Sequence, residues 1–437
     1  MGTDITESQD EFAAFVGIDW AERKHVFALR DDKPERIEVG EIEHTPEAVD
    51  AWAMELSRRF GERPIAVALE QVRGALVFML TKYRHLVIFP VHPATRANYR
   101  KSFRPSGAKG DPHDASLLLD FLIRHPDKLR PIQPDTPETR TLRFLVEERR
   151  KLVEERIRFT QRLCAHLKLY FPQVLNWFCD MSSKIAEDFL ERWPTVQELQ
   201  KARTATLQRF FAEHNSRNPD KIDSRVEEIR RAVPATHDSA VVIASSSAAL
   251  ALARVLHQLR DAISAYDSQI EKLAHAHPDF AIFDSFPGAG AALVPRLIAA
   301  LGTRRDRYRT EHEIQCYSGI APVVESSGKQ HWVHYRRSCP KFLRQTFHEW
   351  AHSIAGSNWA RDYYRQHRAN GQSHHSAVRA LAFKWIRILF RCWQDRTLYD
   401  EAIYTNIRCR RAPNDDSAVQ LQWKTCAGFS KLSLQTS

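Results

Sequence analysis

The sequence predicts an α/β domain at the N-terminus, followed by a mainly helical chain. Between residues 15 and 91, short apolar runs of strand type alternate with amphipathic stretches of helical period, which is the pattern of an α/β layer. From residue 137 to about 400, apolar side chains recur mostly at helical spacing. We therefore expect one sheet-containing domain, a long helical or coiled-coil middle region, and a mainly helical C-terminal domain.

The predicted sheet begins with three strand-like runs in succession. They cover residues 15–20, 25–30 and 36–43. Thr45 and Pro46 then open an amphipathic helix. The continuous apolar run at 64–70 is typical of a parallel strand that is covered on both faces. A helix near 75–83 and a strand at 86–91 complete a β-β-β-α-β-α-β order.

The composition excludes several classes of protein. The 437 residues suffice for about three domains of ~150 residues each, and 43% hydrophobic content excludes wholesale disorder. The 7 cysteines form no CxxC pair, so neither a zinc ribbon nor a secreted disulfide framework is expected. The acidic N-terminus is no signal peptide, and no run approaches ~18 apolar residues, so we expect no membrane partner. Without a disulfide framework or a signal peptide, we expect a cytoplasmic protein. The net charge of +10 favours a polyanionic partner, namely nucleic acid.

Four acidic residues stand at positions suited to metal binding. Asp19 and Glu70 each end an apolar strand. Asp111 and Asp114 lie three apart at the start of an apolar helix, so both carboxylates share one face. Asp111 before Pro112 is also a good helix cap, and each acid alone is equally explained as a cap or a solvated strand end. Jointly, the four favour a two-metal site for phosphoryl chemistry, because Mg²⁺ prefers oxygen ligands.

A basic stretch precedes the two aspartates. Its cationic side chains are Arg96, Arg100, Lys101, Arg104 and Lys109, with Tyr99 and Phe103 between them. Cations suit phosphates and aromatic rings suit bases, so we expect this stretch to bind a strand of nucleic acid beside the acids. The alternative is a helix and loop that are merely solvated.

Two long helices are predicted in the middle of the chain. The first covers residues 137–170, and the second begins near Ser245. Their apolar positions alternate steps of three and four, which favours a coiled coil. The two helices form either one antiparallel stalk or a contact between subunits. The segment from about 172 to 235 is interpreted as an insertion or connector without an assigned role.

Two stretches nearer the C-terminus carry chemical cues. Gly288 and Gly290 precede an apolar helix, as in a helix-hairpin-helix turn that holds a DNA phosphate, although a simple tight turn explains them equally well. Ser326 and Ser327 precede Gly328, which makes an accessible serine in a loop. Basic side chains follow that would stabilise the charge developing on a phosphodiester: Lys329, Arg336 and Arg337. Taken alone, the serine stretch is explained as well by a polar hairpin loop.

In their order, these motifs resemble one known family. They are GIDWAERKHVFAL with Asp19, VALEQVRG with Glu70, KGDPHDA with Asp111 and Asp114, FPGAGAALVPRLIAALG, and YSGIAPVVESSGK with Ser327. The chain resembles the DEDD transposases of bacterial insertion sequences of the one-hundred-ten family, with its eleven-eleven subgroup, which are bridge-RNA-guided recombinases. The resemblance covers roughly residues 15–130 and 280–400, joined by the helical middle.

The resemblance implies a fold, a metal site and a nucleophile. Residues 15–130 would form an RNase H-like (RuvC-like) domain whose four acids bind Mg²⁺ or Mn²⁺. A serine in the C-terminal domain would form a covalent phosphoserine link to DNA; Ser327 matches the family's serine best, with Ser326 as the alternative. The expected domain bounds are a helical middle at 131–279, a transposase domain at 280–410, and flexible ends at 1–14 and 411–437.

The resemblance also implies partners. They are donor and target DNA, a structured guide RNA, and further copies of the chain in a homo-oligomer, either a dimer or a tetramer. In the family, the acids and the serine of one composite site come from different subunits. We therefore expect an RNA-guided recombinase that excises and inserts its own insertion sequence.

Two other functions stay open at this point. A RuvC-like junction resolvase or metal-dependent nuclease would use the four acids with water, leave Ser327 structural, and form no covalent intermediate. A non-catalytic DNA- or RNA-binding protein would use the acids only as caps and solvated ends. The complete set of acids favours an enzyme.

Overall fold

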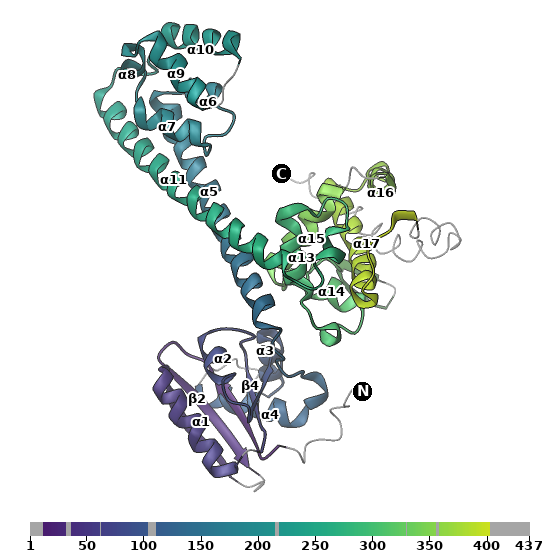
Figure 1. The fold of residues 1–437 in the computed structure, drawn as a ribbon. Helices are drawn as coiled ribbons and strands as arrows, with labels where there is room; N and C mark the ends of the chain where they lie inside the picture. The colour runs from purple at the N-terminus through teal and green to yellow at the C-terminus, as the bar shows by residue number, and fades with distance from the viewer. Residues whose placement is uncertain are drawn as a thin grey trace. The chain divides into compact units, whose positions relative to one another are not determined.

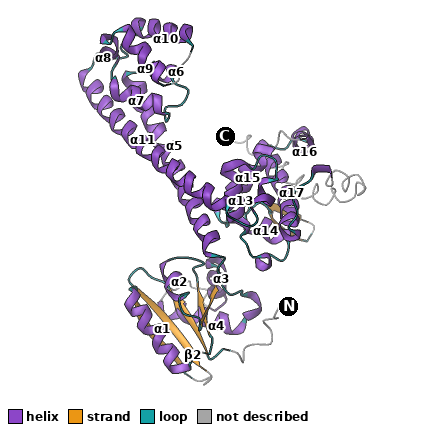
Figure 2. Ribbon diagram, in the orientation of Figure 1, coloured by secondary structure: helices purple, strands orange, loops and turns teal. Residues whose placement is uncertain are grey.

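The computed structural model describes residues 12–31, 36–61, 63–103, 111–214, 218–328, 330–354 and 358–402. The chain divides into two compact units, Met1–Pro134 and Asp135–Ser437. The first is mixed α/β and the second is mostly helical (Figure 2), so the expected combination of an α/β domain with a mainly helical remainder is confirmed. Much of the predicted flexible N-terminus and all of the predicted flexible tail lie outside the described residues, although β1 already begins at Ala14.

The first unit is built on a five-stranded sheet in the order β3-β2-β1-β4-β5. The strands are β1 (Ala14–Asp19), β2 (Lys24–Asp31), β3 (Ile37–Glu43), β4 (Ile65–Leu69) and β5 (Leu86–Pro90). The first three strands pair antiparallel, whereas β4 lies parallel to β1, and β5 lies parallel to β4. The carboxyl ends of β1, β4 and β5 therefore lie at one edge of the sheet, where open α/β sheets usually carry their sites.

Helices cover both faces of this sheet (Figure 1). They are α1 (Pro46–Phe60), α2 (Ala75–Leu80), α3 (Pro93–Phe103) and α4 (Asp111–Arg124), followed by a 3-10 turn at Pro126–Lys128. Strand residues such as Val16 and Ile18 pack with α1 and α2, whereas Ala66 and Ala68 share a core cluster with α4 on the other face. Burial on both faces explains why β4 is an uninterrupted apolar run in the sequence.

Helix α4 approaches β1 closely because small side chains line the sheet beneath it. Gly17 of β1 is paired with Ala28 of β2 on one side and with Ala68 of β4 on the other. A Cβ atom on Gly17 would lie under 3.0 Å from the carbonyl oxygen of Ala115 and from the backbone nitrogen of Leu119. Only glycine fits at this position, and the contact holds α4 against β1 from Ala115 to Leu119, just after its first turn.

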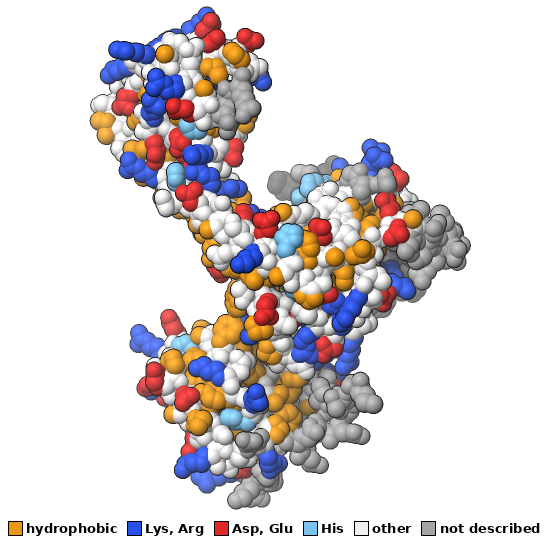
Figure 3. All heavy atoms as spheres, in the orientation of Figure 1, with side chains coloured by type: hydrophobic (Ala, Val, Ile, Leu, Met, Phe, Trp, Pro, Cys, Tyr) orange, Lys and Arg blue, Asp and Glu red, His pale blue; other side chains and the backbone are white. Residues whose placement is uncertain are grey.

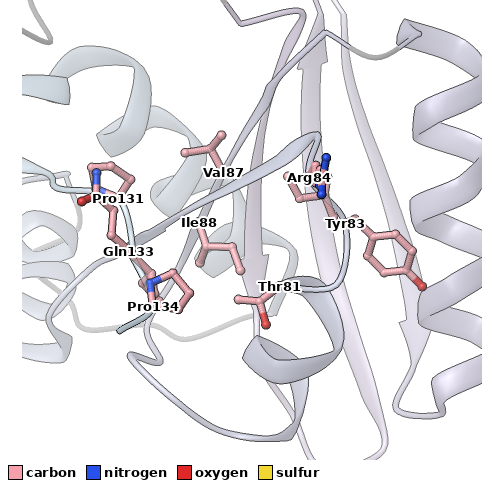
Figure 4. A pocket seen from close by; sticks show the side chains of 10 residues that line it. Thr81, Tyr83, Arg84, Val87, Ile88, Pro131, Gln133 and Pro134 are labelled. Atoms are coloured by element: carbon pink, nitrogen blue, oxygen red, sulfur yellow. The ribbon is translucent and has the colours of Figure 1, made fainter. Parts of the chain in front are cut away.

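A small pocket lies along β5 (Figure 4). It is lined by Thr81, Tyr83, Arg84, Leu86, Val87, Ile88, Pro131, Ile132, Gln133 and Pro134. Most of these residues lie in the turn before β5 or near its start, away from the sheet edge that carries the strand-end acids. None of them is an Asp or a Glu, so the pocket is separate from the predicted metal site.

In the second unit, the two long helices lie side by side and antiparallel (Figure 1). They are α5 (Pro137–Tyr170), which has the predicted bounds, and α11 (Ser239–His275). Leu142 near the start of α5 shares a core cluster with Ile270 near the end of α11. Leu167 near the end of α5 clusters with Leu252 near the start of α11. Of the two predicted arrangements, the chain thus forms the antiparallel stalk within one molecule, while coiled-coil packing stays a prediction.

The segment predicted to be an insertion forms a packed helical subdomain at one end of this stalk. Its helices are α6 (Val174–Trp177), α7 (Lys184–Arg192), α8 (Val196–Lys201), α9 (Thr204–Glu213) and α10 (Pro219–Arg231). Trp177, Phe189 and Phe210 contribute to a core that these helices share with α5 and α11. On the face visible in Figure 3, its surface carries basic and acidic side chains interspersed.

The remainder of the second unit is a helical domain with one β-hairpin. It contains α12 (Phe280–Asp284), α13 (Gly290–Leu301), a 3-10 turn at Arg305–Arg307, α14 (Glu311–Tyr317), β6 (Val323–Ser327), β7 (Gln330–His334), α15 (Lys341–Ile354), α16 (Asn358–Ala369) and α17 (His374–Asp395). Trp350, Trp385 and Trp393 are fully buried. The indole N–H of Trp350 donates to the carbonyl of Pro287 at 3.2 Å. These aromatic residues therefore belong to the core of this domain.

Among the described helices, α11 alone is long and apolar enough to cross a membrane, with a mean hydropathy of 1.8 over 18 residues. The sequence expectation concerned an unbroken run of ~18 apolar residues, and serines at 245–247 interrupt the apolar residues of α11. Here the helix packs on α5 and contributes Leu252 and Leu256 to a core cluster. The core helix of a soluble protein has the same composition, so this one helix is weak evidence for a membrane span.

Candidate acidic site and serine hairpin

Three of the four predicted acids lie together at one edge of the sheet in the first unit. Asp19 is the last residue of β1, Glu70 directly follows β4, and Asp114 lies in the first turn of α4. Because β1 and β4 are parallel neighbours, Asp19 and Glu70 leave the sheet side by side. The close contact of Gly17 with α4 brings Asp114 to the same edge. Asp111 begins α4, but its side chain lies outside the described residues.

The guanidinium group of Arg96 lies between these acids. Arg96 belongs to α3, which follows β5, and its Nη1 lies 2.7 Å from Asp19 Oδ1 and 3.5 Å from Asp114 Oδ2. Its Nε forms an ion pair with Glu70 Oε1. The Arg96 side chain is only 19% exposed. Three carboxylates from three different elements therefore converge on one cationic side chain.

A second arginine, one turn further along α3, contributes to the same cluster. Arg100 Nη2 lies 2.6 Å from Asp114 Oδ2. The pKa of Glu70 is raised above its ordinary value. Burial is the largest cause, and the nearby carboxylates of Asp19 and Asp114 add to it, while Arg96 acts in the opposite direction. A charged carboxylate is costly in a partly buried site near two others, which explains the raised pKa.

The donor set fits a divalent cation in its chemistry, whereas in this structure the carboxylates converge on Arg96. Carboxylate oxygens are the ligands that Mg²⁺ prefers, and the oxygens of Asp19 and Asp114 already contact one shared cationic atom, Arg96 Nη1. The buried Oε1 of Glu70 has the ion pair with Arg96 but accepts no hydrogen bond of normal geometry. Among the side chains that the structure describes, no three acids, histidines or cysteines are arranged to hold a metal ion. Instead, the carboxylates surround a guanidinium group.

The basic residues predicted to bind nucleic acid have different outcomes. Arg96 and Arg100 contact carboxylates in this structure, and Lys101 is exposed on α3. Arg104, Lys109 and Lys329 lie outside the described residues. The Tyr99 hydroxyl donates to Asp120 Oδ2 at 2.5 Å, so this ring is held against α4.

The predicted nucleophile lies at the end of a strand, not in an open loop as expected. Ser327 is the last residue of β6 and is paired with Gln330 of β7. Gly328 follows in the turn with a φ of 56°, a conformation that glycine adopts freely. Ser326 and Ser327 are both exposed. Because successive strand residues point to opposite faces, only one of the two serines can face a given phosphate.

Basic and aromatic side chains surround the base of this hairpin. Arg336 Nε donates to the carbonyl of Ala321 at 3.3 Å, which ties the chain after β7 to the chain before β6. The guanidinium groups of Arg344 and Arg379 lie 4.9 and 4.6 Å from the ring centroid of Tyr335. Arg337 is exposed. The sequence interpretation missed Tyr335 and Arg379, because no local pattern links a residue of α17 to the hairpin.

Two models of transposase families match this chain. A family model for DEDD transposases, described as "Transposase", matches residues 16–172, and such a domain implies an RNase H-like fold for the N-terminal region. This protein is thus a DNA transposase, an enzyme that recombines DNA. A second model, described as "Transposase IS116/IS110/IS902 family", matches residues 281–365. The chain belongs to the IS110 family of DEDD transposases, the one-hundred-ten family that its motifs resemble.

Relatives extend over most of the chain. A candidate mini-circle transposase for IS117 from Streptomyces coelicolor is 28% identical over 409 residues, which cover 90% of this chain and 97% of the relative. A 44.8 kDa protein of insertion element IS116 from Streptomyces clavuligerus is 24% identical over 80% of this chain and 84% of its own length. A 42 kDa protein of insertion element IS900 from Mycobacterium paratuberculosis is 27% identical over 70% of this chain and 76% of its own length.

Proposed function

We propose that this transposase excises and inserts its own insertion sequence through a divalent-metal site and a serine nucleophile. Asp19, Glu70, Asp111 and Asp114 hold the metal, and Ser327 forms a covalent phosphoserine link to DNA. The observation that carries the metal site is the convergence of three described carboxylates on one cationic point. A DEDD domain suggests dependence on a divalent metal. Mg²⁺ is the ion that we propose, with Mn²⁺ as a substitute.

The protein's own contribution to this site is to hold hard oxygen ligands in fixed positions. Asp19 and Glu70 are fixed by the parallel pairing of β1 and β4, and Asp114 is fixed by the contact of α4 with Gly17. When bound, Mg²⁺ would stabilise the negative charge on the phosphate and on the attacking and leaving oxygens. Ligands on rigid elements preserve the geometry that this stabilisation requires.

Ser327 supplies the oxygen for the covalent step. Its Oγ attacks the scissile phosphorus, so that an Oγ–P bond forms and the bond from phosphorus to the leaving deoxyribose oxygen breaks. The hydroxyl proton of the serine is lost, and the leaving oxygen is protonated. A deoxyribose hydroxyl of the second DNA then attacks the phosphoserine, which restores the serine and the phosphodiester without another co-reactant. We propose Lys329, Arg336 and Arg337 as phosphate contacts that stabilise the transition state.

The covalent adduct provides the direct test of the nucleophile. Full-length protein, Mg²⁺ and end-labelled element DNA are expected to give a protein–DNA species that persists on a denaturing gel. Ser327→Ala is expected to abolish this species and Ser326→Ala to retain it, because the two side chains point to opposite faces of the hairpin. An adduct that survives Ser327→Ala contradicts the assignment. Cleavage without any adduct, equally fast in Ser327→Ala, indicates the alternative: a junction resolvase or nuclease that uses water.

The acids are tested on the same substrate. Asp114→Asn is expected to reduce DNA cleavage by about 100-fold or more, the scale of losing one strong electrostatic contact to a transition state. Asp120→Asn is the matched control, because Asp120 lies on the same helix and pairs with Arg124 at 2.6 Å. Equal cleavage by Asp114→Asn and wild type would show that Asp114 has no catalytic role, and absence of cleavage by both proteins would support the non-catalytic alternative, in which the acids serve only as caps and solvated strand ends.

We also propose that a structured RNA selects donor and target DNA by base pairing. This rests on the family resemblance, and the net charge of +10 suits a protein that binds two kinds of polyanion. Recombination between donor and target plasmids is expected to require a transcript of the non-coding DNA beside the gene. Recombination that proceeds equally well without this transcript would refute RNA guidance while leaving the metal and serine assignments intact.

A further inference from the structure

Arg96 contacts three carboxylates at once, and all three belong to the proposed metal site. Its Nη1 forms ion pairs with both Asp19 and Asp114, and its Nε forms an ion pair with Glu70. A guanidinium group can do this because it is planar and presents donors on more than one side. Arg96 therefore offsets part of the negative charge of the three acids.

A divalent cation and this guanidinium group compete for the same oxygens. Mg²⁺ binds carboxylate oxygens at about 2.0–2.1 Å. Arg96 Nη1 lies 2.7 Å from Asp19 Oδ1, so an ion on that oxygen would lie within about 5 Å of the nitrogen. Two cationic groups at this separation repel, and the repulsion is stronger in a partly buried site than in water. This repulsion favours binding of the ion with Arg96 displaced from the acids.

We propose that Arg96 is the resident counterion of the acidic site, and that a divalent cation binds by exchange with its guanidinium group. The inference rests on the proposed metal function of Asp19, Glu70 and Asp114. Before exchange, Arg96 offsets the mutual repulsion of the three carboxylates, while Arg100 keeps its own contact with Asp114. After exchange, the Arg96 side chain is free to turn from α3 toward a DNA phosphate, the role that its sequence context predicted.

The exchange makes a prediction about metal affinity that needs no DNA and no turnover. Mg²⁺ is titrated into full-length wild type and Arg96→Gln in a calorimeter. The variant is expected to bind Mg²⁺ at least about tenfold more tightly, because it lacks a competitor that leaves only a fraction of the wild type ready to bind. Arg59→Gln is the matched control, since Arg59 pairs with Asp31 and Glu38 on the same unit but outside the site. It is expected to bind Mg²⁺ as the wild type does.

A second measurement uses the unaltered protein, so it holds even where Arg96→Gln folds poorly. Phenylglyoxal modifies accessible arginine side chains, and the modified peptides are quantified by mass spectrometry. Mg²⁺ is expected to increase the modification of Arg96 and to leave that of Arg59 unchanged. No change at Arg96, or protection of it by Mg²⁺, overturns the exchange.

The outcomes separate this inference from the proposed metal function. Tighter Mg²⁺ binding by Arg96→Gln, abolished when Asp114→Asn is added, supports the exchange. Equal or weaker binding by Arg96→Gln, with binding still abolished by Asp114→Asn, overturns the exchange and leaves the metal site in place. Failure of Mg²⁺ and Mn²⁺ to bind wild type and every variant overturns the metal site, and the exchange with it.

Discussion

The turn that follows Asp19 is held by His25, a side chain with no role in the proposed chemistry. His25 is fully buried, and its Nδ1 accepts a hydrogen bond from the backbone N–H of Ala21 at 3.3 Å. Its Nε2 lies 2.9 Å from His44 Nδ1. Since Nδ1 accepts, the proton of the neutral ring is on Nε2 and is donated to His44. The contact with Ala21 thus requires neutral His25, because a protonated ring has no acceptor nitrogen.

This arrangement predicts a dependence of stability on pH. Burial, with a smaller contribution from His44, lowers the pKa of His25 from 6.5 to about 4. As the pH falls below 6.5, the unfolded chain takes up a proton at His25 and the folded chain does not. The free energy of unfolding should therefore fall between about pH 6.5 and pH 4, by at most about 3 kcal/mol, and level off below.

Urea unfolding of wild type and His25→Gln at several pH values measures this contribution. The difference in unfolding free energy between the two proteins should shrink steadily as the pH falls through that window. A difference that is constant from pH 7 to pH 4 would show that His25 is not the titrating group.

At the scale of elements, the packing of α4 on β1 sets the distance between Asp19 and Asp114. Gly17→Ala places a Cβ against the backbone of Ala115 and Leu119, which cannot rotate away. We expect a loss of about 1–3 kcal/mol in stability, the usual cost of overpacking, together with weaker Mg²⁺ binding as α4 shifts. Thermal unfolding and calorimetry measure the two effects.

Gly40→Ala is the control for this prediction. A Cβ there meets the ring of Phe27, so it also strains the sheet, but on β3 and away from the acids. It is expected to lower stability and to leave Mg²⁺ affinity unchanged. Equal loss of affinity in both variants would mean that α4 does not set the position of Asp114.

The elements themselves were largely predictable from the sequence. The predicted helix at 137–170 has the bounds of α5, and the five predicted strands match β1 to β5 to within about two residues. These segments are strongly periodic or continuously apolar, so local pattern suffices. The segment 172–235 was harder, because its short helices have a recognisable core only once they pack on α5 and α11. The stretch around Ser327 was predicted to be a loop, because Gly328 and the basic residues after it are typical of a turn. The strand β6 was therefore not predicted.

At the scale of the whole molecule, the acids belong to the first unit and Ser327 to the second. The family resemblance implies that a complete site combines the acids of one subunit with the serine of another. Asp114→Asn and Ser327→Ala should each fail to form the covalent DNA adduct alone. Heteromers of the two, co-expressed with different tags and purified through both, should form it, because the Ser327→Ala subunit supplies intact acids and its partner supplies the serine.

The alternative for this experiment is a site completed within one chain. In that case every subunit of the heteromer carries one defective half, and no adduct forms. Heteromers of wild type with Ser327→Ala serve as the positive control for assembly, since they retain at least one complete site under either arrangement.

The sequence by itself determined the elements and the positions of the acids along them, because strand and helix periodicity and strand-end placement are local properties of the chain. Only the tertiary structure decided the electrostatic partners of those acids. The ion pair between Arg96 and Asp19 joins residues 77 positions apart, and it exists because β4, β5 and α3 return the chain to the end of β1. The sequence of this basic helix predicted contact with nucleic acid, whereas tertiary packing pairs its Arg96 and Arg100 with the protein's own carboxylates.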